Sequence, residues 1–314
     1  MAPFHARDMG LGPFPIKTAA PAGSMTLTDS TVAVVIPAYK AESLIEQAVR
    51  SVLQQTHADW EAWIVTDDGE DYEELLGRAG LVDERFHFLS SGRVGAGASR
   101  ARNLALDRIS APYVAILDAD DRLKPRKLEL AVAALAEHPI VASALEVMDD
   151  GYTHLRFVGD GEDRVLTPGA YKFVNLSMDS MIVWDRRRCD ARYDLELTNM
   201  TDLELLMQLW RTAGTVHHLG TPQHDYVKLS SSMSNGIGVT EKMIASKKAL
   251  LQRLETGHYR FAAPGAAEGL IAFLGLSLAA EAAYPMALEE KPGLLFEDHL
   301  EPMLRAYEQR VKLD

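Results

Sequence analysis

The stretch Tyr113-Val-Ala-Ile-Leu-Asp-Ala-Asp-Asp121 decides the fold that we predict for this chain. Its first five residues are apolar, as in a buried strand. Three carboxylates follow within four residues, and a helix pattern starts near Pro125, a residue type favoured in the first helical turn. A buried strand that ends in polar residues and leads into a helix is typical of parallel α/β sheets, which bind ligands beyond the carboxyl ends of their strands.

The segment before this stretch alternates between apolar runs and amphipathic patterns. Alternation of this kind predicts a parallel sheet with helices on both faces. The carboxyl ends of the predicted strands carry three polar segments, at 37–40, 66–69 and 118–121, which we expect to meet at one edge of the sheet. The pattern predicts strands at 32–36, 62–65, 86–89 and 113–117, and helices at 42–55, at 98–108 and from about 125.

After about residue 139 the alternation weakens, which indicates a mixed or antiparallel part of the sheet. We therefore predict a disordered leader or a leftover of recombinant expression at 1–30, an α/β domain at 31–238 with halves at 31–139 and 140–238, and a helical extension at 239–314. The later pattern predicts strands at 140–148, 153–158, 164–166, 181–184, 216–219 and 224–229, and helices at 201–212, 240–255, 266–283 and 297–310.

Composition excludes several classes of protein. The chain is 47% hydrophobic and 25% charged, which indicates an ordinary globular protein. Its net charge of −13, from 32 basic and 45 acidic residues, argues against a broad surface for nucleic acid. The single Cys189 excludes an internal disulfide and favours a reducing, cytoplasmic setting. Its neighbours Arg186, Arg187 and Arg188 could activate the thiol, but we favour a lone small apolar side chain in an irregular stretch.

No stretch of the sequence suggests a membrane span. The most apolar run, Gly269 to Ala280, lies between Glu268 and Glu281 and is shorter than the roughly 20 residues that a span needs. We interpret it as a buried or interfacial helix. The first 30 residues lack the apolar core of a signal peptide, and Met25 is an alternative native start.

The acidic cluster at Asp118, Asp120 and Asp121 has two interpretations. Clustered carboxylates repel one another unless a cation or hydrogen-bond donors offset their charge. Mg²⁺ or Mn²⁺ does so while leaving positions open for a substrate's phosphates. The alternative is an acidic cap on the following helix, a position that Asp favours. The residues alone do not decide between the two.

Five motifs in order resemble the family 2 glycosyltransferases of the GT-A fold. The resemblance covers residues 31–234, and the order and spacing of the motifs make it specific. It implies an inverting enzyme that uses a nucleotide-diphosphate sugar, a UDP sugar by expectation, with Mn²⁺ or Mg²⁺. The motifs are Val35-Ile-Pro-Ala-Tyr-Lys40, residues 48–56 with Asp59-Trp-Glu61, Asp67-Asp-Gly69, Ser99-Arg-Ala-Arg-Asn103 and Leu117-Asp-Ala-Asp-Asp121.

The resemblance implies roles for single residues on the donor side. Tyr39 would stack on the nucleotide base, and Asp67 or Asp68 would bind the base, with Asp67 favoured. Asp120 would ligate the metal ion, and Asp118 would contact the ribose or the metal. The donor-binding residues implied in this way are Pro37, Tyr39, Asp67, Asp68, Arg102, Asp118 and Lys228.

On the acceptor side, Asp202 matches the general base of the family. A carboxylate that accepts the acceptor's proton contributes about 10²–10⁴-fold to such a reaction. The alternative is a carboxylate that only favours the start of its helix. Thr201 and Leu229 depart from the family pattern, which often has Glu and His there. In place of that His, either Lys228 would supply positive charge to the diphosphate, or the metal ion alone would hold it. We interpret His217, His218 and His224 as structural rather than as metal ligands.

The expected partners are a nucleotide-sugar donor and a saccharide, lipid-linked or protein-linked acceptor, without nucleic acid. The predicted C-terminal helices, with Phe273 and Leu274 on their apolar run, would cover the acceptor side, form a homo-oligomer contact or touch the inner face of the membrane, unless they only pack into the core. Two other functions stay open: a nucleotidyltransferase, which would be expected to carry a Gly-rich loop with Lys, and a non-catalytic GT-A-like carbohydrate-binding or scaffold protein.

Overall fold

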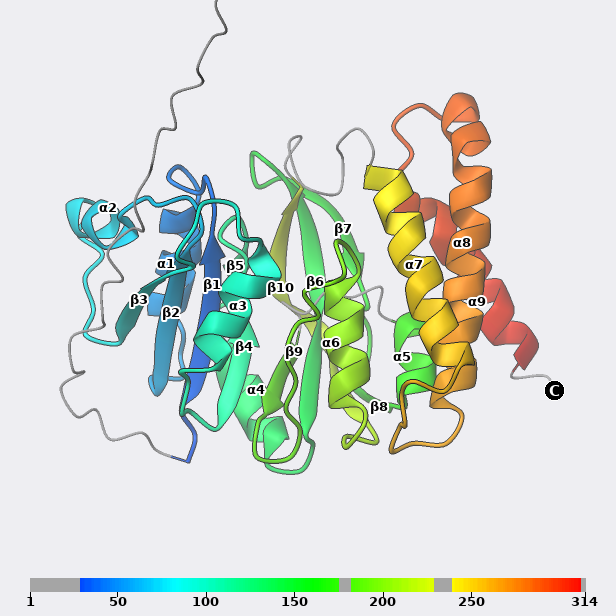
Figure 1. The fold of residues 1–314 in the computed structure, drawn as a ribbon, viewed down its shortest axis with the longest axis horizontal. Helices are drawn as coiled ribbons and strands as arrows, with labels where there is room; N and C mark the ends of the chain where they lie inside the picture. The colour runs from blue at the N-terminus through cyan, green and yellow to red at the C-terminus, as the bar shows by residue number, and fades with distance from the viewer. Residues whose placement is uncertain (1–28, 175–181, 229–238, 312–314) are drawn as a thin grey trace, which may run out of the picture.

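The computed structural model of the chain describes residues 29–174, 182–228 and 239–311. The predicted leader therefore lies outside the described residues except for its last two positions, and so does Leu229. One mixed sheet is flanked by helices, and further helices pack at one end of it (Figure 1). In chain order the elements are β1 (Val32–Ala38), α1 (Ile45–Leu53), β2 (Trp60–Thr66), α2 (Tyr72–Arg78), β3 (Phe86–Ser90), α3 (Ala98–Leu106), β4 (Tyr113–Ile116), β5 (Arg122–Leu123), α4 (Lys127–Leu135), β6 (Ile140–Asp149), β7 (His154–Val158), β8 (Arg164–Leu166), α5 (Pro168–Val174), β9 (Ile182–Asp185), α6 (Thr201–Leu209), β10 (Val216–Lys228), α7 (Val239–Glu255), α8 (Ala266–Glu290) and α9 (Phe296–Val311).

The first half of the chain forms the parallel part of the sheet, as predicted. The strand order is β3-β2-β1-β4, and every pairing among these four strands is parallel. Their residues are apolar on both faces because helices cover both faces. Even residues of β1, such as Val34, pack with α1, α2 and α4, whereas odd residues, such as Val35, pack on the side of α3 and α6.

The second half is mixed, also as predicted. β9 runs antiparallel to both β4 and β6, so β6 and β10 again run in the direction of β4. The prediction of two strands at 216–219 and 224–229 is wrong, because β10 is continuous, with a register shift between Leu219 and His224. Gly220 does not turn the chain there. A Cβ on it would lie 2.0 Å from the carbonyl oxygen of Gly161, so the glycine permits a close backbone approach.

The C-terminal helices pack against α5 and against one another beside the sheet (Figure 1). Helix α8 is longer than the predicted 266–283, because the helix continues through Pro285 to Glu290. By length and composition, with a mean hydropathy of 1.5, it is the one described helix that could cross a membrane, contrary to the prediction of no such stretch. One third of its most apolar window is buried in the fold, including Phe273 and Leu274.

Glycines set the distance between α5 and α8. A Cβ at Gly269 would lie 2.3 Å from the carbonyl oxygen of Gly169, and a Cβ at Gly169 would lie 2.7 Å from that of Gly265. Real Cβ atoms do not approach backbone so closely, so these helices cross at a contact that only glycine allows. The C-terminal helices are thereby held rigidly on the part of the chain that precedes β9.

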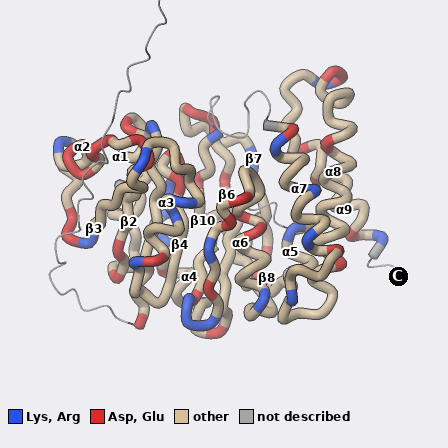
Figure 2. The backbone as a smooth tube through the Cα atoms, viewed as in Figure 1, with Lys and Arg blue, Asp and Glu red and all other residues tan. Residues whose placement is uncertain are grey.

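A buried ion pair also holds the C-terminal helices together. The Nζ of Lys247 on α7 lies 2.5 Å from Oε1 of Glu281 on α8, and both side chains are almost fully buried. Lys and Arg are interspersed with Asp and Glu along much of the described chain (Figure 2), whereas the charged residues of α8 are all Glu. Glu281, which follows the apolar run Gly269 to Ala280, is therefore a buried residue inside a longer helix.

We expect Glu281→Ala to destabilise the protein strongly, because it leaves the Lys247 ammonium buried without its partner. Breaking a buried pair in this way costs about 3–5 kcal/mol. The matched control is Glu74→Ala, which breaks the exposed pair with Arg78 and should cost less than about 1 kcal/mol. Urea unfolding of both variants measures the difference, and equal losses would contradict the assignment.

Candidate active site

The three polar segments at the carboxyl ends of β1, β2 and β4 adjoin one another. Ala38 pairs in register with Thr66, and the Asp67 amide donates to the Ala38 carbonyl over 2.8 Å. On the other side of β1, the Leu117 amide donates to the Val35 carbonyl over 2.9 Å. The topology therefore brings together the segments that follow these strands.

Asp67 connects this edge to the start of α3. Its buried carboxylate accepts the backbone N–H groups of Ala96 (2.9 Å) and Gly97 (2.8 Å). Gly97 has a φ of 99°, which favours glycine. An anion at the amino end of a helix is stabilised by free N–H groups and by the helix dipole. The sequence did not reveal these donors, because backbone N–H groups leave no pattern in side chains.

Asp68 organises the loop that contains Tyr39. Its carboxylate accepts hydrogen bonds from the hydroxyls of Thr66 (2.9 Å) and Tyr72 (2.8 Å) and from the amides of Glu70 (3.0 Å) and Lys40. Burial raises the pKa of Asp68, but these four donors outweigh burial, so its pKa lies below the usual value.

Tyr39 and Pro37, the other two predicted donor-binding residues of this region, lie at the same edge of the sheet. The Tyr39 ring is 48% exposed, and the Lys40 ammonium lies 5.3 Å from its centroid. Pro37 is partly exposed near the end of β1. The structure thus brings together Pro37, Tyr39, Asp67 and Asp68.

The acidic turn follows β4 at the same edge. Asp118 accepts a hydrogen bond from Nη2 of Arg102 on α3, and that guanidinium lies 5.2 Å from the ring centroid of Tyr193. Burial and the negative charges of Asp121 and Asp118 raise the pKa of Asp120 to about 7. The turn therefore carries an excess of negative charge that the described residues around it do not fully offset.

Asp121 is fully buried and faces β10. Its Oδ2 lies 2.8 Å from Nε2 of His224, and its Oδ1 accepts the Val227 amide over 2.9 Å. Burial and the charge of Lys127 lower the pKa of His224 to about 3, so the imidazole is neutral. Sequence reasoning treated this histidine as structural without finding its partner, because the two residues lie 103 positions apart.

The other two histidines of β10 also have structural contacts. Nε2 of His218 lies 2.6 Å from the carbonyl oxygen of Gly159, and the ring of His217 stacks on that of His138 at 4.7 Å. In the described part of the chain, no three or more His, Cys, Asp and Glu side chains gather in a way that could hold a metal ion. A cation at Asp118 and Asp120 would therefore need oxygen ligands from substrate or water.

Asp202 lies in the first turn of α6, which starts after Met200 in a left-handed conformation (φ 58°). Because α6 ends shortly before β10 begins, its carboxyl end lies near the start of β10, and its amino end lies toward the edge where β4 and β10 end. Lys172 of α5 is electrostatically coupled to Asp202. Burial lowers the pKa of Lys172 to about 8, and the charge of Asp202 opposes this shift.

Lys228 is the last residue of β10. Its ion-pair partner is Glu297 and not a carboxylate of the acidic turn. Its Nζ donates to Oε2 of Glu297 on α9 over 3.1 Å. Arg156 on β7 makes a similar contact with α9, since it pairs with Asp298 and with Glu301 (2.8 Å). These contacts fasten α9 to the sheet, so Lys228 is not brought together with Asp118–Asp121.

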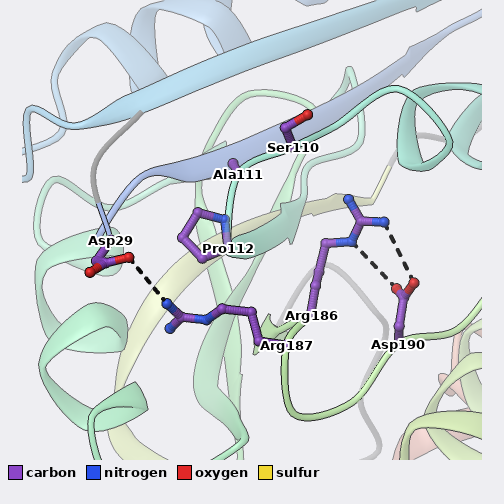
Figure 3. A pocket seen from close by; sticks show the side chains of 7 residues that line it. All are labelled: Asp29, Ser110, Ala111, Pro112, Arg186, Arg187 and Asp190. Carbon is purple, nitrogen blue, oxygen red and sulfur yellow. Dashed lines mark hydrogen bonds and ion pairs between the residues drawn. The ribbon is translucent and has the colours of Figure 1, made fainter. Parts of the chain in front are cut away.

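A cavity of about 400 Å³ lies at the opposite edge of the sheet, at the amino ends of β1 and β4 (Figure 3). Its two arginines are partly neutralised, since Arg187 lies 3.7 Å from Asp29 and Arg186 lies 3.4 Å from Asp190. Because it lies at the opposite edge of the sheet, the cavity is separate from the acidic turn. It is lined by Asp29, Ser110, Ala111, Pro112, Arg186, Arg187 and Asp190.

Cys189, near this cavity, is buried, and its Sγ lies 3.6 Å from the carbonyl oxygen of Asp185. Burial and the charge of Asp185 raise the pKa of its thiol to about 12. We expect iodoacetamide at pH 8 to label native Cys189 at least about 100-fold more slowly than the guanidinium-unfolded chain, because only the thiolate reacts. Mass spectrometry measures the label, and rapid native labelling would contradict this assignment.

The mixed sheet and its flanking helices resemble solved glycosyltransferase structures of the GT-A class of fold. S. aureus TarS, residues 1–349 in complex with UDP-GlcNAc, has the same fold, with a TM-score of 0.65 and 14% identity over 87% of this chain and 79% of that one. A mannosyltransferase, PcManGT from Pyrobaculum calidifontis in complex with GDP-Man and Mn²⁺, gives a TM-score of 0.53 and 16% identity over 90% and 80% of the two chains. The predicted fold class is confirmed.

Residues 33–162 match the sequence model described as glycosyl transferase family 2, and this segment belongs to that family. TuaG of Bacillus subtilis, a putative teichuronic acid biosynthesis glycosyltransferase, is 42% identical over 106 residues, which are 33% of this chain and 42% of TuaG. WfgD of Escherichia coli is 33% identical over 114 residues, 36% of this chain and 44% of WfgD. The chain thus spans less than half the length of these two relatives.

Proposed function

We propose that the chain is an inverting glycosyltransferase that moves a sugar from a nucleotide-diphosphate sugar, a UDP sugar, to an acceptor hydroxyl. The observation that carries this proposal is the acidic turn Asp118–Asp121, which lies beside Asp67, Asp68 and Tyr39 within the segment that belongs to family 2. WfgD, by its name, uses UDP-Glc, and the TarS structure holds UDP-GlcNAc, which supports a UDP sugar as donor.

The donor would bind along the edge formed by β1, β2 and β4. The exposed ring of Tyr39 has room to stack on the base, and Asp67 or Asp68 would accept its imide N–H. Both carboxylates already accept backbone hydrogen bonds, which fix their position before the donor binds. Arg102 holds Asp118 toward the ribose or the cation.

Asp118 and Asp120 would hold Mn²⁺ or Mg²⁺, and the residues present fit such an ion. Asp120 is largely buried beside two further carboxylates, and its pKa is raised to about 7, so the turn favours an added positive charge. Two carboxylates with phosphate oxygens and water are a usual set of ligands for these ions. When bound, the ion acts as a Lewis acid for the departing diphosphate. Lys228 stays a proposed donor contact only if its pair with Glu297 opens.

On the acceptor side, Asp202 would accept the proton of the attacking hydroxyl. Attack from the side opposite the diphosphate inverts the anomeric centre, so the base and the acidic turn must lie on opposite sides of the sugar. The amino end of α6 approaches the carboxyl edge of the sheet from the half that does not hold the nucleotide motifs, which supports this placement.

For the acceptor, WfgD's name gives a sugar linked to diphosphoundecaprenol, which supports a saccharide or lipid-linked acceptor here. Such an acceptor would place the enzyme in the cytoplasm at the inner face of the membrane. The long apolar helix α8 is a candidate contact with that membrane or with a second copy of the chain.

Calorimetric titration of UDP into the protein with and without Mn²⁺, followed by a hydrolysis assay over a panel of UDP and GDP sugars, tests the proposal. We expect Mn²⁺-dependent UDP binding and slow hydrolysis of one UDP sugar. Absence of nucleotide binding would overturn it. Binding without hydrolysis or transfer of any sugar would favour a non-catalytic protein.

A further inference from the structure

The segment that follows Asp120 is fixed to β10 by a cluster of contacts. The Lys124 amide donates to the Gln223 carbonyl over 3.0 Å, and the Lys124 ammonium lies 2.7 Å from Oδ1 of Asp225. Nη2 of Arg122 lies 2.9 Å from Oδ2 of Asp225. Strand β10 thus holds the chain immediately after the acidic turn.

At the head of this cluster, the side chains of Asp121 and His224 are both fully shielded from solvent. A carboxylate accepts hydrogen bonds, so the Nε2 of His224 that faces it at 2.8 Å carries the hydrogen. The second oxygen is occupied by the Val227 amide at 2.9 Å. Both oxygens of Asp121 therefore point to β10.

The acidic turn is anchored at both ends. The Leu117 amide binds the Val35 carbonyl of β1, and Asp121 binds β10, so only Asp118, Ala119 and Asp120 lie between the anchors. Asp118 is held by Arg102. For Asp120, in contrast, no side-chain hydrogen-bond partner occurs among the residues that the structure describes.

We propose that Asp121 and His224 are positioning residues, which fix the acidic turn so that Asp118 and Asp120 can share a divalent cation, and that Asp121 is not itself a ligand. The three carboxylates then have different roles. Asp118 is oriented by the Arg102 guanidinium and shares the cation with Asp120, whereas Asp121 is held by β10. The cation in this proposal rests on the proposed function, whereas the anchoring of Asp121 on β10 rests on the contacts alone.

The physical reason is the mutual repulsion of carboxylates in a partly buried turn. Without the cation, backbone contacts, hydrogen bonds and the charges of Arg102 and Lys127 keep the turn in place. Residues that orient metal ligands from behind typically change metal affinity by about 10–100-fold when they are replaced. His224 donates to Asp121 without adding a charge to the turn, so it can hold Asp121 without competing with the cation.

His224→Phe removes the donor, and His224→Gln supplies an amide N–H₂ near the place of Nε2. The matched controls are His218→Phe and His218→Gln, since His218 is equally buried on the same strand and binds the Gly159 carbonyl far from the turn. Two readouts are measured on the full chain: the Mn²⁺ concentration needed for half-maximal UDP binding, and the hydrogen exchange rate of the Val227 amide.

We expect His224→Phe to raise the required Mn²⁺ concentration by about 10-fold or more, with little change in UDP binding without metal. Val227 exchange should accelerate, and His224→Gln should restore most of both properties. The His218 variants should leave the Mn²⁺ requirement unchanged. If His224→Phe does not fold, His224→Gln is compared with His218→Gln, and we expect a small but measurable rise in the Mn²⁺ requirement only in the former.

A folded His224→Phe variant with the wild-type Mn²⁺ requirement would overturn the proposal. If only the Gln variants fold, an identical Mn²⁺ requirement in His224→Gln and His218→Gln would overturn it. If the wild-type protein does not bind UDP at all, the proposed function fails. The anchoring of Asp121 by His224 is then tested by the hydrogen exchange of the Val227 amide alone. In that case, wild-type Val227 exchange in His224→Phe would overturn this anchoring, and faster exchange would support it.

Discussion

Asp120→Asn is expected to abolish the Mn²⁺-dependent part of UDP binding while the protein stays folded. The carboxylate is the one in the acidic turn that the other described side chains leave without a hydrogen bond, so its loss removes a ligand rather than a structural contact. The amide oxygen of Asn is a much weaker ligand for a hard cation than a carboxylate. Calorimetric titration of UDP with and without Mn²⁺ measures the effect.

The same substitution should stabilise the metal-free protein at alkaline pH. Burial and two neighbouring carboxylates raise the pKa of Asp120 to about 7, whereas the unfolded chain has the ordinary value near 4. A raised carboxyl pKa favours the folded state fully below the unfolded value, and this advantage is lost as pH rises from about 4 to about 7. At pH 8, Asn removes a cost on the order of 1 kcal/mol or more.

Melting temperatures in EDTA at pH 5 and pH 8 test this second effect. The variant should gain relative to the wild type at pH 8, and the gain should shrink at pH 5. Asp163→Asn is the matched control, because Asp163 accepts the Gly220 amide (2.8 Å) away from the turn and should not affect Mn²⁺-dependent binding. A folded Asp120→Asn protein with wild-type UDP affinity in Mn²⁺ would show that the cation does not bind at this residue.

The parallel half of the sheet could be predicted because its strands are buried on both faces. Such strands form unbroken apolar runs, and the predicted strand at 86–89 differs from β3 by one residue. Short elements could not be predicted in this way. Helix α2 has seven residues and buries only Tyr72 and Leu76, and β5 has two residues that are extended because they pair with β10. Helix α5 is equally short and was missed for the same reason.

Positions of the candidate site residues followed from topology, whereas their contacts did not. Parallel strands place their carboxyl ends together, so Tyr39, Asp67 and Asp118 had to share one edge. The partners of these residues come from backbone groups or from distant parts of the chain. Asp67 is held by the Ala96 and Gly97 amides, and Lys228 is paired with Glu297 on a helix whose packing no local pattern specifies.

The prediction that separates catalysis from structure concerns Asp202. Asp202→Asn preserves the shape of the side chain and keeps an oxygen at the first turn of α6. It removes only the charge that acts on buried Lys172, so we expect at most a small loss of stability and unchanged UDP binding. The neutral amide cannot accept the proton of the acceptor hydroxyl, so sugar transfer should fall by about 10²-fold or more.

The same helix offers a matched control two residues further on. Glu204 is buried, and its carboxylate accepts hydrogen bonds from Gln208 (2.6 Å) and Tyr259 (3.0 Å). In Glu204→Gln, one of these oxygens becomes an N–H₂ group that faces a donor, so we expect lower stability by about 1–3 kcal/mol and near-normal turnover per folded molecule. The two variants should therefore show opposite patterns of stability and turnover. Wild-type turnover in folded Asp202→Asn would show that a group other than Asp202 accepts the proton.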